Sequence, residues 1–83
     1  MSHDSNLVYM ANQIGKFFAH QPTDKAIDSI ADHLFKYWDP RMRKAIVVHL
    51  EEHAGAGLDR RTLAAVQKVR DRDRQKLLAT LRR

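Results

Sequence analysis

Cysteine is absent from this 83-residue sequence, and glycine and proline are scarce. Without cysteine the chain has no disulfide, no thiolate metal site and no cysteine nucleophile. No apolar run approaches the roughly 18 residues that a membrane-spanning helix needs, and the short polar start of the chain does not resemble a signal peptide. We therefore expect a cytoplasmic protein that has no membrane contact.

Strand patterns are also missing, because no segment alternates apolar and polar residues with a period of two. There is no internal repeat and no low-complexity segment. A chain of this length forms one domain with a limited core, so we expect marginal stability unless a partner adds buried surface.

The formal net charge of +5 is concentrated at one end of the chain. Residues 1–69 carry nine Lys or Arg against eight Asp or Glu, whereas residues 70–83 carry six against two. A nucleic-acid-binding domain more often has its basic face on the folded body, which is nearly neutral here. We therefore interpret residues 1–69 as the helical domain and residues 70–83 as a basic helical extension or a frayed tail.

Apolar residues recur at helical spacing in four segments. The pattern predicts helices over about residues 6–20, 23–38, 40–53 and from 59 onwards. Gly15, inside the first of them, is compatible with close approach of another backbone. The predicted fold class is all-α: a small compact bundle of three to four helices with short connections.

Several residues suit the ends of these helices. Gly55 or Gly57 is expected to supply the left-handed residue that ends the third helix. On the second helix, Asp32 and Lys36 can pair across one turn. The expected N-caps are Ser5 or Asn6, Thr23 or Asp24, Asp39, and Asp59.

Residues 38–43, with the sequence WDPRMR, organise the chain. Pro40 cannot continue the preceding helix, yet it suits the first position of a new helix that has Asp39 as its N-cap. The first turn of this new helix carries three cations, which oppose the helix macrodipole: Arg41, Arg43 and Lys44. These cations are either solvated or held for an anionic or acidic partner.

Some apolar side chains exceed what the core of a small bundle needs. Phe35 lies at the edge of its stripe. Val47 and Val48 point roughly 100° apart, so the third helix is either central or has a second face for a partner. The leucines of the extension either cap the bundle or stand exposed for another protein: Leu77, Leu78 and Leu81.

The sequence shows no recognisable catalytic constellation. His49 and His53 are four residues apart, but Leu50 stands where the zincin pattern requires glutamate. Because no third ligand is indicated, we interpret both histidines as lying at the solvent-exposed edge of a helix, and we predict no metal site. Neither a nucleophile–base pair nor a phosphate-binding glycine loop is present. The residues thus indicate a non-catalytic helical module, with an anion site of low specificity at the basic helix start.

Three stretches, read together, resemble a known family. They are residues 7–18 (LVYMANQIGKFF), residues 30–34 (IADHL) running into 37–43 (YWDPRMR), and residues 55–59 (GAGLD). In this order and spacing they are similar to the delta subunit of NAD-dependent, molybdenum- or tungsten-containing formate dehydrogenase, over about residues 7–69.

The resemblance implies a small cytoplasmic accessory subunit with no cofactor or catalytic residue of its own. In that complex the large alpha subunit carries bis-molybdopterin guanine dinucleotide, while other subunits carry FMN and iron–sulfur clusters. The implied role is to support assembly and stability of the enzyme, and maturation of its large subunit. The alpha and other subunits are the implied partners, and weak self-association is left open.

Two groups of residues are candidates for these contacts. Core packing is the alternative role of each apolar candidate. The apolar anchors, of a kind favoured at the centres of interfaces, are Phe17, Phe18, Phe35, Trp38, Val47 and Val48. The cations that suit acidic residues, phosphates or a guanine nucleotide are Arg41, Arg43, Lys44, Arg60 and Arg61.

The alternative function is that of a small basic helical protein that binds nucleic acid through its tail and its arginine-rich helix starts. Salt-dependent retention on DNA, lost on deletion of residues 70–83, would favour this alternative. Co-purification with a large molybdoprotein would favour the accessory subunit.

Overall fold

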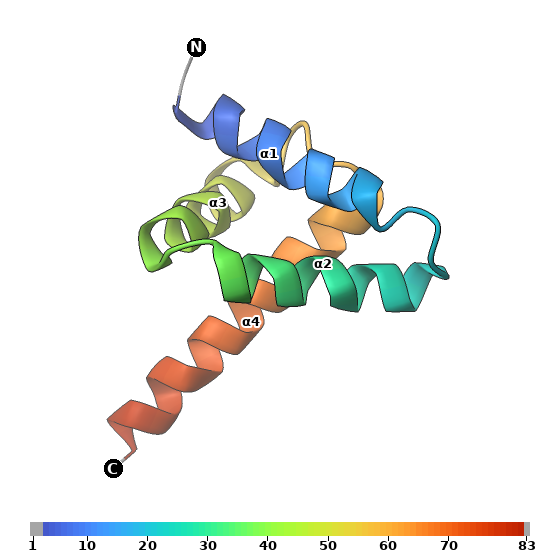
Figure 1. Ribbon diagram of the computed structural model, residues 1–83. Coiled ribbons are helices and arrows are strands. Elements are labelled where there is room, and N and C mark those ends of the chain that lie inside the picture. Colours follow the sequence, from blue (N-terminus) through green and yellow to red (C-terminus); the bar gives the residue numbers. More distant parts are fainter. Residues whose placement is uncertain (1–2, 83) are drawn as a thin grey trace.

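Four helices make up the protein in a computed structural model that describes the backbone of residues 3–82 and the side chains of residues 6–82. They are α1 (His3–Phe17), α2 (Thr23–Tyr37), α3 (Pro40–His53) and α4 (Arg60–Leu81) (Figure 1). No strand occurs over residues 3–82. The expected all-α class is confirmed, and none of these helices has the length and apolar character that crossing a membrane requires.

A single apolar core joins the four helices. Helix α4 packs against each of the other three, and α1 also contacts α2 and α3. The buried residues follow the helical periodicity seen in the sequence, because each helix turns one stripe inward. The core consists of Leu7, Ala11, Ile30, Ala31, Leu34, Trp38, Ile46, Leu50, Ala65, Val66 and Val69.

The first helix lies closer to the N-terminus than the sequence pattern predicts. It spans His3–Phe17, so both Ser5 and Asn6 lie inside it and the prediction that one of them is its cap is wrong. Serine and asparagine cost only a few tenths of a kcal/mol in a helix interior, so they do not force a start there. Beyond the helix the chain tightens into a turn in which the Ala19 N–H donates to the Lys16 carbonyl (3.2 Å).

Helix α2 begins directly after a proline. Pro22 occupies the N-cap position with φ −55° and ψ 150° and no side-chain cap bond, so the predicted caps Thr23 and Asp24 are wrong. The Pro22 carbonyl accepts the Ala26 N–H at 2.8 Å and opens the helical ladder. Proline suits this last extended residue because its φ is fixed and its missing N–H is not needed there.

Helix α3 begins as expected. Asp39 is its N-cap and accepts the Met42 N–H at 2.9 Å, with Pro40 at the first helical position. The left-handed backbone at its end starts one residue earlier than predicted, at Ala54 (φ 54°), and continues at Gly55 (φ 69°).

One side chain of α1 clamps the connection between α3 and α4. Asn12 donates from Nδ2 to the Gly57 carbonyl and accepts the Asp59 N–H at Oδ1, each at 2.9 Å. Asp59 is the N-cap of α4 as expected, although its side chain makes no cap bond. The entry into α4 is thus fixed from α1.

Helices α1 and α4 approach closely at Gly15. A Cβ atom at this position would collide with the Thr62 hydroxyl. Thr62 is fully buried, and its Oγ1 has no hydrogen-bond partner among residues 3–82. The glycine in the middle of α1 is therefore explained by the neighbouring helix.

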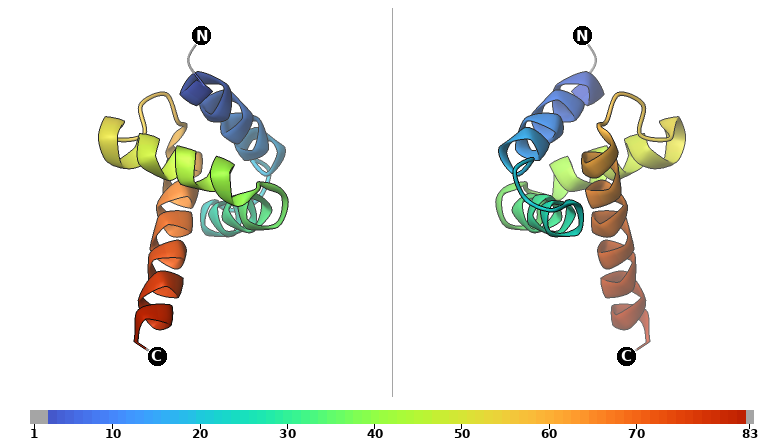
Figure 2. Two further views of the ribbon diagram at one scale, coloured as in Figure 1. Left: turned by 90° about the vertical axis from the view of Figure 1, so that its left-hand side faces the viewer. Right: turned by 90° about the vertical axis from the view of Figure 1, so that its right-hand side faces the viewer.

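Helix α4 extends well beyond the core. It runs unbroken to Leu81, but its buried residues all lie between Thr62 and Val69. Figure 2 shows that its C-terminal part projects away from the other helices. Residues 70–81 are therefore helical and mostly solvent-exposed.

Candidate functional site

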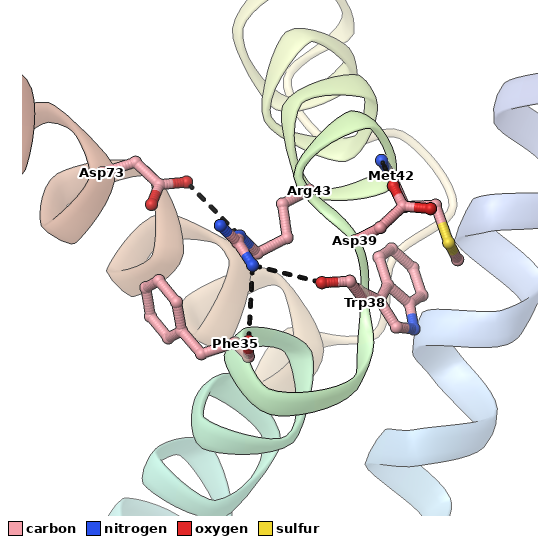
Figure 3. A network of polar contacts seen from close by, with 6 residues as sticks. All are labelled: Phe35, Trp38, Asp39, Met42, Arg43 and Asp73. Carbon is pink, nitrogen blue, oxygen red and sulfur yellow. Dashed lines mark hydrogen bonds and ion pairs between the residues drawn. The ribbon is translucent and has the colours of Figure 1, made fainter.

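Arg43, a candidate cation for a partner, is bound within the fold (Figure 3). Its Nη1 donates to the carbonyls of Trp38 (3.1 Å) and Phe35 (3.3 Å), and its Nε lies 3.9 Å from Oδ2 of Asp73 on α4. The two carbonyls belong to the end of α2, where unsatisfied C=O groups carry partial negative charge. The cation that opposes the macrodipole of α3 thus stabilises the end of α2.

Arg61, near the start of α4, plays a similar part. Its Nη1 donates to the carbonyls of Gln21 (3.1 Å) and Ala19 (3.3 Å) in the connection between α1 and α2. Both arginines satisfy backbone carbonyls that irregular structure would otherwise leave to water.

The other three candidate cations are exposed, and none has a hydrogen bond or ion pair within residues 6–82. Arg41 and Lys44 lie at the start of α3, and Arg60 lies at the start of α4. The structure does not combine these cations into one site, because they belong to the starts of two different helices. The shallow hollow beside Arg60 also includes Asp59, whose carboxylate reduces its attraction for anions.

Three of the six apolar candidates contribute to the fold itself. Trp38 is only 5 % exposed in the core, and Figure 3 shows its indole directed towards α1, away from Arg43. Phe35 is half-buried between two guanidinium groups, with that of Arg72 at 4.3 Å and that of Arg43 at 5.4 Å from the ring centroid. Val47 packs against the core, half-buried.

The other apolar candidates include two neighbouring phenylalanines that form part of a surface. Phe17 is 72 % exposed at the end of α1, and its ring meets that of half-buried Phe18 edge-on at 5.0 Å. Phe18 lies 6.2 Å from the ring of His33, which lies 4.6 Å from that of Tyr37, also 72 % exposed. We call these four residues the aromatic strip. Val48 is exposed separately on α3.

Sequence reasoning missed two members of the aromatic strip. His33 and Tyr37 are four residues apart on α2, a spacing that places their rings on one face of a helix. The helical spacing of apolar residues in α2 includes Tyr37 and would place it with the core residues, whereas the structure exposes it. The predicted pair of Asp32 and Lys36 forms beside it at 2.9 Å, and the hydrogen bond that the Lys36 ammonium donates to the Asp32 carboxylate raises the pKa of Lys36 above its usual value.

The interpretation of the paired histidines is wrong for one of them. His49 is buried, with Nε2 2.8 Å from the Ala56 carbonyl, so it ties α3 to the following loop instead of lying at a solvent-exposed edge. His53 is exposed. Among the side chains of residues 6–82, no three His, Asp or Glu gather in a way that could hold a metal ion.

Comparison with known families identifies the chain. No curated protein and no solved structure matches it significantly. Residues 6–66, however, match the family of the NADH-dependent formate dehydrogenase delta subunit, FdsD. The matched range contains Asn12, Gly15 and Arg43, whose contacts are described above. It ends before the projecting part of α4. The chain therefore belongs to the FdsD family of formate dehydrogenase delta subunits.

Proposed function

We propose that this delta subunit binds a larger subunit of formate dehydrogenase through the aromatic strip. Membership of the family makes the other subunits of the enzyme its partners. The observation that supports this surface is the exposure of Phe17 and Tyr37, both 72 %, at the two ends of a continuous row of ring contacts through Phe18 and His33. Exposed aromatic side chains at the centre of a contact contribute most of the energy in many interfaces.

The geometry of the strip suits such a contact. Phe17 and Tyr37 are each held by a ring contact with a half-buried neighbour, Phe18 or His33. Anchors that are already ordered lose little conformational entropy on binding. The Asp32–Lys36 pair beside them supplies a polar rim.

The proposed role is non-catalytic support of assembly, stability and maturation of the complex. The sequence supports it because cysteine is absent and no nucleophile–base pair is recognisable. Bis-molybdopterin guanine dinucleotide, FMN and iron–sulfur clusters then belong to the other subunits, and this chain needs no cofactor of its own.

Binding to formate dehydrogenase purified without its delta subunit tests the aromatic strip. The double variant Phe17→Ser/Tyr37→Ser should bind at least about tenfold more weakly than the natural chain, because both anchors are lost. Its stability should stay within about 0.5 kcal/mol, since both residues are exposed. The matched control is Tyr9→Ser, which removes another exposed aromatic of α1 outside the strip. Natural affinity in the double variant would contradict the proposal.

Maturation is tested by the composition of the assembled enzyme. Cells that produce the complex with the Phe17→Ser/Tyr37→Ser chain should yield enzyme with less molybdenum per large subunit and proportionally less formate oxidation. The Tyr9→Ser chain should give the normal content of both. Full metal content with the double variant would limit the role of the strip to assembly.

We also propose Arg41 and Lys44 as contacts for acidic residues or for the phosphates of a guanine nucleotide. Both are exposed and unpaired within residues 6–82, and they lie at the start of α3, where helix N–H groups favour anions. Calorimetric titration of the chain with GTP should give heat that the variant Arg41→Ala/Lys44→Ala loses. No heat with the natural chain would remove the nucleotide and leave only the acidic partner.

A further inference from the structure

The projecting end of α4 exposes three leucines on one side. Leu77 is 60 %, Leu78 45 % and Leu81 70 % exposed. We call these three residues the leucine ridge. It lies outside residues 6–66, the part of the chain that matches the family.

The ridge does not continue the core of the bundle. With about 100° of rotation per residue, its centre lies roughly a third of a turn around α4 from the direction of the buried residues, which run from Thr62 to Val69. The other three helices also stop short of it, as Figure 2 shows. Nothing in residues 3–82 therefore covers these leucines.

The charges around the ridge are of one sign. The acidic residues of this half of α4 are already engaged, Asp71 with Arg70 (3.1 Å) and Asp73 with Arg43 (3.9 Å). From residue 75 to residue 82 there are two cations, Lys76 and Arg82, and no acidic residue. Helical geometry places these two cations on either side of the ridge.

We propose that this end of α4 is a second docking surface, which inserts the leucine ridge into an apolar groove with an acidic rim on another subunit of formate dehydrogenase. The proposal uses the family assignment for its partner, and it concerns a surface separate from the aromatic strip. Charge complementarity selects the acidic rim. A small contact is enough for measurable binding at the ridge. When the aromatic strip is already bound to the enzyme, the leucine ridge is present at the groove at high effective concentration.

A second copy of this chain fits the ridge poorly. A stable dimer buries about 800 Å² on each partner, more than three leucines offer. Each copy would also bring Lys76 and Arg82 to the same contact, where like charges repel. A membrane surface fits poorly as well, because α4 contains no aromatic residue of the kind that anchors interfacial helices.

Binding of full-length variants to formate dehydrogenase purified without its delta subunit tests the ridge. Leu77→Ser/Leu81→Ser should weaken binding about five- to thirtyfold with an unchanged unfolding midpoint. Lys76→Glu/Arg82→Glu should weaken binding and flatten its dependence on salt. Ala79→Ser, on the opposite side of the same helix, is the matched control and should bind normally.

The results separate the ridge from the aromatic strip. Natural affinity in Leu77→Ser/Leu81→Ser, with weak binding by Phe17→Ser/Tyr37→Ser, would overturn the ridge and keep the strip. The reverse result would support the ridge and overturn the strip.

Two further probes test other ligands for the same helix. Phosphatidylcholine–phosphatidylserine vesicles and a DNA duplex should each bind the natural chain no better than Leu77→Ser/Leu81→Ser and Lys76→Glu/Arg82→Glu. Vesicle binding that depends on the leucines, or DNA binding that depends on the cations, with subunit affinity unchanged in both variants, would overturn the proposal.

Discussion

Arginines at helix starts act here on the ends of other segments. Arg43 and Arg61 each donate twice from one nitrogen to carbonyls outside their own helix. The arginine side chain is long and its guanidinium carries several N–H donors. A guanidinium attached at a helix start can therefore reach the carbonyls at the end of another helix, where a positive charge is favourable. Position relative to the macrodipole of one helix is therefore a poor guide to the role of an arginine.

Replacement of Arg43 tests this role. Arg43→Ala should lower the free energy of unfolding by about 1–3 kcal/mol, because two carbonyls at the end of α2 lose their donor. The control Lys44→Ala, at the next residue, which is exposed, should change it by no more than about 0.5 kcal/mol. Urea unfolding followed by circular dichroism measures both, and equal midpoints would show that the Arg43 contacts contribute nothing.

The contact between Gly15 and Thr62 gives a second prediction. Gly15→Ala should destabilise the chain by about 1–3 kcal/mol, because overpacking against the Thr62 hydroxyl outweighs the better helix propensity of alanine, about 1 kcal/mol. In the Thr62→Ala background the same change should be close to neutral or stabilising. A thermodynamic cycle over the four chains measures the coupling, and additive effects would contradict the collision.

At the scale of the element, the helix count and the start of α3 were predictable from the sequence, whereas several boundaries were not. Asp39 and Pro40 define a start by local chemistry alone. The limits of α1 lie about three residues from the predicted ones, and its start has no such local signal, since Ser5 and Asn6 are tolerated inside a helix as well as at its cap.

The candidate site was only partly predictable for the same reason. Phe17 was predicted as a surface anchor, but Trp38 lies in the core. Partners outside their own helices contact Arg43, Phe35 and His49, and the periodicity within one helix does not report such partners.

The variant Asn12→Asp, which replaces the side-chain amide nitrogen by oxygen, tests whether the two Asn12 hydrogen bonds stabilise the fold. Asn12→Asp keeps the acceptor for the Asp59 N–H but loses the donor to the Gly57 carbonyl and places a charge beside it. We expect a loss of about 1–2 kcal/mol in the free energy of unfolding. Gln13→Glu makes the same change on the exposed neighbour, and an equal loss in both variants would assign the effect to charge alone.

The projecting part of α4 should be dispensable for folding. A chain that ends at Gln75 keeps the Arg72–Phe35 and Arg43–Asp73 contacts and the whole core. Its urea midpoint should therefore match that of the full chain, while its helical circular dichroism falls with the residues removed. A clearly lower midpoint would show that the last turns support the bundle.

At the scale of the whole molecule, residues 6–82 enclose one apolar core, and their exposed apolar side chains include the two surfaces proposed for docking. The aromatic strip joins the end of α1 to α2, and the leucine ridge lies on the far part of α4. A small domain with little surplus stability gains from partners that cover such surfaces.

Self-association of the isolated chain should be weak. Neither surface offers the area of a stable dimer, and the net charge of +5 opposes pairing. Sedimentation equilibrium at moderate salt should give the mass of one chain up to about 100 µM, a range in which only weak dimers stay dissociated. A dimer at low micromolar concentration would contradict this expectation.

The location of Trp38 has a practical consequence for spectroscopy. It is the single tryptophan of the chain, and its side chain is buried in the core at the connection between α2 and α3. Its fluorescence therefore follows opening of the core in an unfolding experiment and stays nearly constant while Phe17 or Leu81 is being covered. Emission from this buried indole therefore reports on folding, whereas an extrinsic label near residue 80 suits the measurement of docking by the leucine ridge.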